Sequence, residues 1–238
     1  MTTTYQQATQ YPSAYQGLPK RHPENKELTL WYGSTYRNAE IYTAKGPMVK
    51  EYLDGLIDTY QKHSQQYTKR FVVMVNLYFP TQSSLEQRVQ QDYFKRFMAS
   101  LNAQIDAHGE RKRAQGDGRT NKIRFCRVYE DGLNRGLHIH AVLFFNGHSF
   151  RALGDFNSTQ SNLYHRIVAA WASALGLYPC QVIQEGLIDL SHAGYFIDSS
   201  TASSKRVVLE MFKHYSYICK AYSKRYDLPV KVFSRSRG

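Results

Sequence analysis

The chain has 238 residues, of which 42% are apolar and 14% aromatic, and its 31 Lys and Arg against 19 Asp and Glu give a formal charge of +12. This apolar content is enough for a core and excludes a wholly disordered protein. No apolar run approaches the roughly 18 residues of a membrane helix, and the polar N-terminus does not resemble a secretory signal. Three widely spaced cysteines indicate a reducing compartment without a structural zinc site. We therefore expect a soluble, intracellular protein with no membrane partner.

Two segments carry the excess positive charge. Residues 205–238 contain nine Lys and Arg against two acidic residues, and residues 108–127 contain seven against two. Solvated loops would explain one cluster, but two clusters in a chain with 19 tyrosines favour a nucleic-acid partner, because such partners are bound by phosphate contacts and base stacking. The candidate phosphate contacts are Arg111, Lys112, Arg113, Lys213, Lys224, Arg235 and Arg237. For the first three, a mobile surface loop is an equally good interpretation.

The N-terminal part of the chain shows little regular patterning. Residues 1–23 have no periodicity, and we interpret them as a disordered arm. Residues 24–69 form an N-terminal helical extension, with a helix over about Met48 to Gln65. The β-branched and aromatic run Arg70–Phe79 ends at a proline and predicts a strand, which opens the main domain over residues 70–238.

A long amphipathic helix follows the first strand. Ser83 and Glu86 resemble a capping box, and apolar residues at a spacing of four continue to Ile105. Gly109 is expected to end this helix. The basic stretch over residues 108–120 contains three glycines and is predicted to be a loop.

The second half of the chain predicts further strands and helices. Lys122–Glu130 and Leu137–Phe145 are strands joined as a hairpin, and a helix follows over about Ser161 to Leu175. Tyr178–Ile183 is a possible strand, and a long helix runs from about Lys205 to Tyr226. This order of elements predicts an α+β fold with a central antiparallel β-sheet flanked by helices.

The strongest chemical signal is a pair of histidines on the second hairpin strand. His138 and His140 are two residues apart, so alternation places both imidazoles on one face, where they can bind one divalent metal. Glu130, at the end of the partner strand, is the candidate third ligand, with Asp131 as the substitute if the register differs by one. The competing interpretation is a polar sheet face beside an acidic turn.

The final predicted helix supplies a candidate nucleophile. On a helical wheel, Tyr217 and Lys220 lie on the polar side, one turn apart. A nearby ammonium favours the ionised phenol and attracts phosphate, so this pair is suited to nucleophilic attack. Tyr222 lies on the apolar side, and we therefore expect one working tyrosine. The competing interpretation of Tyr217 is an exposed tyrosine on a basic helix.

In order and spacing, these motifs resemble those of the HUH endonucleases, which comprise rolling-circle replication initiators, relaxases and single-strand transposases. The shared features are His138-Ile-His140, a carboxylate shortly before it, and Tyr217-Ile-Cys-Lys220 downstream. The closer likeness is to the inovirus-type initiators, namely the filamentous-phage gene-II-like and YagK/YfjJ C-terminal-like proteins. Arg70–Pro80 is similar to their first motif strand, and Tyr215–Lys220 with the Phe233–Arg237 tail is similar to their C-terminal signature.

The resemblance spans roughly Arg70 to Arg237 and implies an HUH or RRM-like sheet with the nucleophilic tyrosine on a C-terminal helix. It implies that His138, His140 and Glu130 bind Mg²⁺ or Mn²⁺. Tyr217 would then attack the scissile phosphate of single-stranded DNA, and Lys220 would help to position the phosphate or the metal. The products would be a 5′-phosphotyrosine and a free 3′-OH.

The resemblance also implies partners and a setting. The substrate would be single-stranded or hairpin origin DNA of a phage or mobile element, in the cytoplasm of a bacterial host. A polymerase would extend the 3′-OH, and a separate helicase would unwind the duplex, because the sequence contains no nucleotide-binding loop.

Two other functions are compatible with these motifs. A non-catalytic origin-binding protein or repressor on the same fold would bind DNA in a salt-dependent way, without metal, and would tolerate His138→Ala. A relaxase or transposase would share the chemistry, but transposases of this kind are usually smaller and relaxases usually carry long C-terminal regions.

Overall fold

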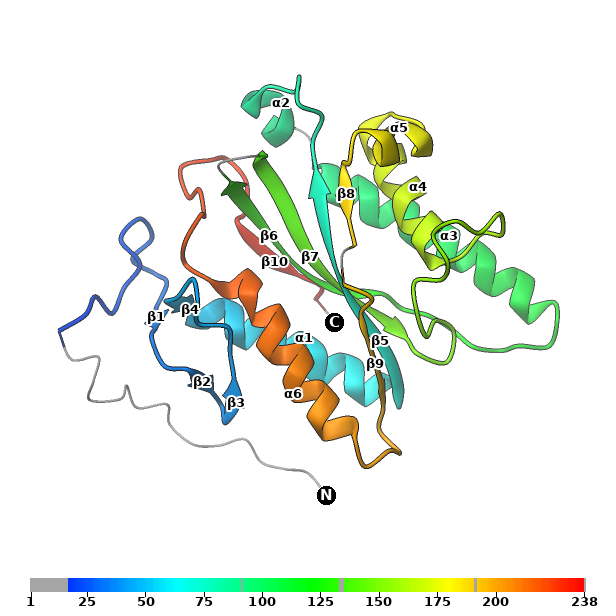
Figure 1. Cartoon of the computed structure of the whole chain (residues 1–238), viewed down its shortest axis with the longest axis horizontal. Coiled ribbons are helices and arrows are strands. Elements are labelled where there is room, and N and C mark those ends of the chain that lie inside the picture. Colours follow the sequence, from blue (N-terminus) through cyan, green and yellow to red (C-terminus); the bar gives the residue numbers. More distant parts are fainter. Residues whose placement is uncertain (1–16, 91, 133–134, 191, 238) are drawn as a thin grey trace.

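A six-stranded antiparallel sheet forms the centre of the molecule, which confirms the predicted α+β class (Figure 1). The computed structural model describes residues 17–90, 92–132, 135–190 and 192–237. The strand order is β10-β6-β7-β5-β8, and β9 also pairs with β5. The strands are β5 (Lys69–Tyr78), β6 (Arg124–Gly132), β7 (Gly136–Asn146), β8 (Ile188–Asp189), β9 (Tyr195–Asp198) and β10 (Phe233–Arg235).

Helices cover both faces of this sheet. They are α1 (Lys50–Gln66), α2 (Leu85–Gln90), α3 (Tyr93–Arg113), α4 (Leu163–Leu175), α5 (Pro179–Gln184) and α6 (Ser204–Tyr215), and the 3₁₀ helix η2 (Ser216–Cys219) continues α6. Alternate residues of β5 and β7 point to opposite faces: Val73 and Ile139 enter the core under α3 and α4, whereas Val72 and Val142 enter the core under α1 and α6. No helix in the described part of the chain is both long and apolar enough to cross a bilayer.

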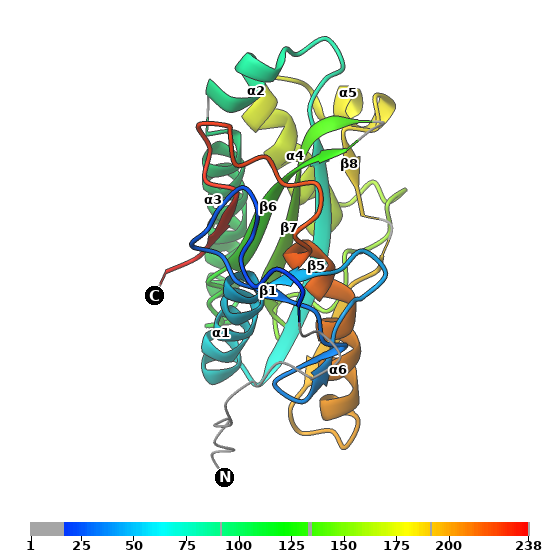
Figure 2. The ribbon, with the colours of Figure 1, turned by 90° about the vertical axis from the view of Figure 1, so that its left-hand side faces the viewer.

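The N-terminal segment is integrated with the rest of the fold. The predicted helix is present as α1, and four short strands precede it: β1 (Leu30–Trp31), β2 (Thr35–Tyr36), β3 (Ala39–Glu40) and β4 (Met48–Val49). Figure 2 shows this segment beside α1 and α6, and residues of all of them share one core with the sheet. Apolar residues of this segment therefore pack in the same core as one face of the sheet.

The predicted disordered arm lies only partly within the described residues. Residues 1–16 are outside them. Within residues 17–23, Arg21 forms a β-bridge with Thr29, and His22 is buried with its ring 4.7 Å from that of Tyr226. Residues 17–23 therefore contact the remainder of the chain.

The predicted helix over residues 83–109 consists of two helices with different ends. Ser84 caps α2, because its hydroxyl accepts from the Gln87 N–H at 3.2 Å while the Gln87 side chain accepts from the Ser84 N–H at 2.8 Å. The predicted Ser83 and Glu86 box was one residue out of register. Helix α3 starts at the Asp92 cap and continues to Arg113, so Arg111–Arg113 form a helical last turn instead of the predicted loop.

Two further predictions were wrong for local reasons. Tyr178–Ile183 is not a strand: Pro179 occupies the first turn of α5, where its fixed φ and missing N–H suit a helix. The final helix does not run to Tyr226. The α-helix ends at Tyr215, and after η2 the extended Lys220 forms a β-bridge with Met48.

Candidate active site

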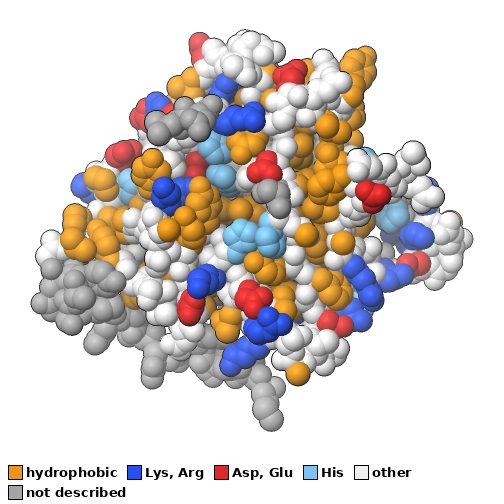
Figure 3. Space-filling view, in the orientation of Figure 1, with side chains coloured by type: hydrophobic (Ala, Val, Ile, Leu, Met, Phe, Trp, Pro, Cys, Tyr) orange, Lys and Arg blue, Asp and Glu red, His pale blue; other side chains and the backbone are white. Residues whose placement is uncertain are grey.

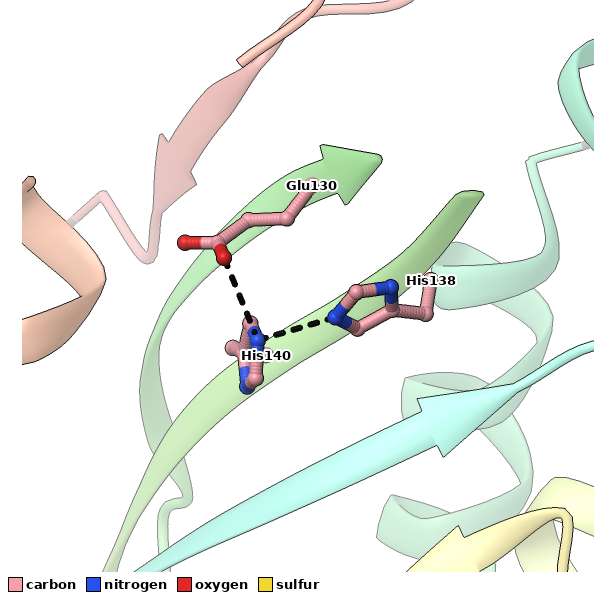
Figure 4. A group of neighbouring side chains, drawn as sticks. All are labelled: Glu130, His138 and His140. Atoms are coloured by element: carbon pink, nitrogen blue, oxygen red, sulfur yellow. Dashed lines mark hydrogen bonds and ion pairs between the residues drawn. The ribbon is translucent and has the colours of Figure 1, made fainter. Parts of the chain in front are cut away.

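Strand register brings the three predicted metal ligands together. Glu130 on β6 is directly opposite His138 on β7, and His140 follows two residues later on the same face. Figure 3 shows histidine side chains gathered near the middle of one face of the molecule, and Figure 4 shows both imidazoles and the Glu130 carboxylate converging. Asp131 does not belong to this cluster; it is paired with Arg225 at 2.8 Å.

Hydrogen bonds fix how the two imidazoles present their nitrogens. The Nδ1–H of His138 donates to the Gly136 carbonyl at 2.8 Å, and the Nδ1–H of His140 donates to Asn76 Oδ1 at 2.5 Å. The Asn76 amide is oriented in turn by donation from its Nδ2 to Asp189 at 3.0 Å. Because a neutral imidazole carries one N–H, both Nε2 atoms are left as lone-pair donors.

The resulting donor set fits a cation. The two Nε2 atoms are 3.0 Å apart, and Glu130 Oε2 lies 3.4 Å from His140 Nε2. The ligand atoms of all three residues lie within 4.8 Å of one another, and all three residues are buried. The two Nε2 lone pairs face each other with no donor between them, which a metal ion would correct. Burial, followed by the proximity of His140, lowers the pKa of His138 to about 4 and keeps it available as a neutral ligand.

Two buried lysines also contact the carboxylate of Glu130. The Lys220 ammonium contacts Glu130 Oε2, and the Lys224 ammonium is 2.5 Å from Oε1. Burial opposes ionisation of Glu130, but the contact with His140 and the charges of Lys224 and Lys220 outweigh it and lower the carboxyl pKa. Lys224 was predicted to contact DNA; instead its side chain is 0% exposed and completes this ion-pair cluster. Burial lowers the pKa of both lysines, that of Lys220 to about 8, while the Glu130 charge opposes this shift.

Tyr217 lies beside this cluster, on η2 rather than on an α-helix. Its ring is 5.5 Å from that of His140, and the Lys220 ammonium is 3.5 Å from the centre of the Tyr217 ring. Burial, with a further contribution from Glu130, raises the pKa of the Tyr217 phenol to about 12. The net shift is opposite in direction to the one that a neighbouring ammonium alone would cause, because desolvation and the Glu130 charge have the larger effect.

Some aromatic and polar residues around the site were not predicted from the sequence. Tyr42, from the N-terminal segment, packs edge-on against Tyr217 at 5.1 Å, and its backbone N–H donates to Ser216 Oγ. Tyr78 on β5 lies 5.3 Å from His138. Asn76 could have been found, because it is a polar residue within the apolar run of β5. No local signal identifies Tyr42, since a contact distant in sequence brings it to the site.

The other predicted DNA contacts lie elsewhere. Arg111, Lys112 and Arg113 are at the C-terminal end of α3, which covers the opposite face of the sheet. Lys213 pairs with Glu40 at 2.6 Å. Arg235 lies on β10 and pairs with Asp58 at 3.2 Å, and Arg237 is exposed near the C-terminus.

Comparisons with known proteins place the chain in a family. The model of the YagK/YfjJ C-terminal domain family matches residues 33–236. The Escherichia coli (strain K12) protein described as "Uncharacterized protein YfjJ" is 24% identical over 204 residues, which cover 81% of this chain and 97% of that protein. No solved structure matches.

Proposed function

Because the chain belongs to the YagK/YfjJ C-terminal domain family and brings a His-His-Glu donor set beside a tyrosine, we propose that it is a metal-dependent, HUH-type enzyme of the inovirus-initiator kind. It would nick and rejoin single-stranded DNA and so initiate rolling-circle replication of a phage or mobile element. The observation that carries the proposal is the contact between the Tyr217 ring and the ring of His140.

His138, His140 and Glu130 would hold Mg²⁺ or Mn²⁺. Such an ion supplies Lewis-acid polarisation of a non-bridging phosphate oxygen and neutralises the charge that develops there. The Lys220 ammonium, which lies over the Tyr217 ring, would attract the same phosphate. Both features favour a phosphodiester as the substrate.

Tyr217 would supply the nucleophile. Its phenolic oxygen forms a bond to phosphorus as the bond between phosphorus and the 3′-oxygen breaks, and the phenolic proton is transferred to the leaving 3′-oxygen. The products are a 5′-phosphotyrosine and a free 3′-OH, and the reverse transfer rejoins the strand. A phenol with a pKa raised to about 12 is a weak nucleophile, so its proton must leave during the attack. The Lys220 ammonium over the ring would stabilise the developing negative charge on the phenol.

A covalent-adduct assay tests this proposal. The protein is incubated with Mn²⁺ and single-stranded DNA that spans its own replicon, and the mixture is then denatured. We expect a protein–DNA adduct that EDTA and Tyr217→Phe both abolish. Tyr222→Phe is the matched control, because Tyr222 is exposed five residues further along and should leave the adduct intact. An adduct that survives Tyr217→Phe would show that the nucleophile is wrongly assigned.

A non-catalytic DNA-binding protein on the same fold is the second candidate. Two observations favour it: both carboxylate oxygens of Glu130 form ion pairs with lysines, and the pKa of the Tyr217 phenol is raised. It predicts tight DNA binding with no adduct, no effect of EDTA on binding, and full binding by His138→Ala. The same experiment therefore separates the two functions.

A further inference from the structure

A second positively charged site lies away from the metal-binding cluster. A cavity of about 650 Å³ opens between the C-terminal half of α3, the loop that follows it, and residues 148–150. Ile105, Ile123 and Phe150 form its apolar part. The charged side chains that line it are Lys112, Arg113, Arg119, Lys122, Asp106 and Asp117.

The cavity carries more positive than negative charge, because four Lys and Arg side chains line it against two Asp side chains. Arg119 pairs with Asp117, its neighbour in the loop. No carboxylate within the described ranges forms an ion pair with Lys112, Arg113 or Lys122. Such an excess of unpaired cations in a concave site attracts anions, because low-dielectric walls concentrate the field.

An unused hydrogen-bond donor belongs to Asn121, one of the residues that line the same cavity. Asn121 Oδ1 accepts from the Asn146 N–H at 2.6 Å, which fixes the orientation of the amide. Its Nδ2 is buried and has no acceptor among the residues that the structure describes. A buried donor without an acceptor costs about 1–3 kcal/mol, so this position is suited to an oxygen of a bound ligand.

The cavity is separated from the metal-binding cluster by the length of a strand and by the sheet itself. His138 lies near the start of β7, whereas Ser149 and Phe150 follow its end. The eight residues from His138 to Asn146 span roughly 27 Å at the usual rise of an antiparallel strand. Figure 3 shows Lys and Arg side chains gathered towards this end of the molecule.

From these observations we infer that the cavity binds the phosphate group of a phosphate ester, with Lys112, Arg113 and Lys122 compensating its charge and Asn121 Nδ2 donating to one of its oxygens. Two sources supply such a group: the backbone of DNA bound along the protein, and a free nucleotide. The site does not depend on the proposed nicking chemistry.

Arg113→Gln combined with Lys122→Gln removes two of the cations without adding bulk. The matched control is Lys26→Gln combined with Lys95→Gln, since both lysines are exposed and neither lines the cavity. ADP and pyrophosphate are titrated by calorimetry, and a fluorescent single strand is titrated by anisotropy over a range of salt concentrations. All titrations contain EDTA, so that a metal centre does not contribute. Equal thermal unfolding of the two variants checks that the fold is kept.

Binding of ADP and pyrophosphate that weakens at least tenfold in the cavity variant, but not in the control, would identify free nucleotides as ligands. If the small anions do not bind, weaker DNA binding with a log–log salt slope that is shallower by about 1.4 would identify the DNA backbone, since each phosphate contact to a single strand contributes about 0.7. The Asn121 side-chain amide resonance should shift with the ligand that binds. Equal affinities and salt slopes in the two variants, with no shift at Asn121, would overturn the proposal.

Discussion

The metal-binding cluster and the cavity at the end of α3 both contain lysines, but they use them in opposite ways. Lys220 and Lys224 are buried and share the carboxylate of Glu130. Lys112 and Lys122 line an open cavity and have no carboxylate partner among the described residues. In sequence the two clusters look alike, as basic runs. The comparison teaches that only the burial and pairing of a cation distinguish an internal ion pair from a ligand-binding surface.

Removal of Glu130 should have the largest effect on stability. Glu130→Ala leaves two buried ammoniums without a counter-charge, which costs about 3–5 kcal/mol in the free energy of unfolding. Urea denaturation measures this loss. Glu210→Ala is the control, because its pair with Arg206 is exposed and contributes at most about 1 kcal/mol. Equal losses in the two variants would show that the buried ion pairs do not exist.

The buried His63 should make the free energy of unfolding depend on pH. His63 is fully buried, and burial lowers its pKa from 6.5 to about 4, while its Nε2–H donates to the Phe145 carbonyl. The unfolded chain takes up a proton at His63 below its ordinary pKa, whereas the folded protein does so only near pH 4. The contribution of neutral His63 to the free energy of unfolding is therefore complete above pH 6.5. It is lost as the pH falls from 6.5 to 4, by up to about 3 kcal/mol.

The difference between wild type and His63→Gln isolates this contribution, because glutamine keeps a donor for the Phe145 carbonyl. Denaturation at a series of pH values should show the gap between the two proteins narrowing towards pH 4. A constant gap would mean that His63 titrates normally in the folded state.

Loss of the hydrogen bond from His140 to Asn76 should weaken metal binding by one to two orders of magnitude. Asn76→Ala frees the imidazole of His140 to turn, and loss of such a supporting bond usually weakens metal binding about 10- to 100-fold. Calorimetric titration with Mn²⁺ measures the change, with the exposed Asn157→Ala as control. Unchanged Mn²⁺ affinity in Asn76→Ala would show that His140 is not a ligand in this orientation.

Removal of a lysine that lines the cavity should have the smallest effect on the free energy of unfolding. Lys122→Ala removes an ammonium that has no ion-pair partner among the described residues, so the free energy of unfolding should change by no more than about 0.5 kcal/mol. The same denaturation series that tests Glu130→Ala measures it. A loss of several kcal/mol would mean that the cavity lysine, like Lys224, has a structural role.

Much of the sheet and the metal-binding cluster could be predicted from sequence, because period-two alternation is local. The β-branched and aromatic run Arg70–Phe79 predicted β5, and His138 and His140 were correctly placed on one face of β7. Glu130 could be assigned because a hairpin fixes the register between neighbouring strands.

The C-terminal part could not be predicted, because distant contacts determine it. Helical periodicity was extended beyond Tyr215, but the β-bridge between Lys220 and Met48 and the hydrogen bond from Ala221 N–H to the Pro47 carbonyl end the helical path. The prediction therefore placed Lys224 on a solvated face. A lysine is seldom buried unless it is paired, and its partner, Glu130, lies 94 residues earlier.

The measurement that tests the central claim most directly is identification of the residue that carries the DNA. Protein incubated with Mn²⁺ and origin-spanning single-stranded DNA is digested with nuclease and trypsin, and the remaining nucleotide is located by tandem mass spectrometry. We expect a 5′-phosphate ester on the peptide His214–Lys220, at Tyr217 and not at Tyr215. Attachment at Tyr42 or Tyr222, or DNA that binds tightly without becoming attached, would contradict it.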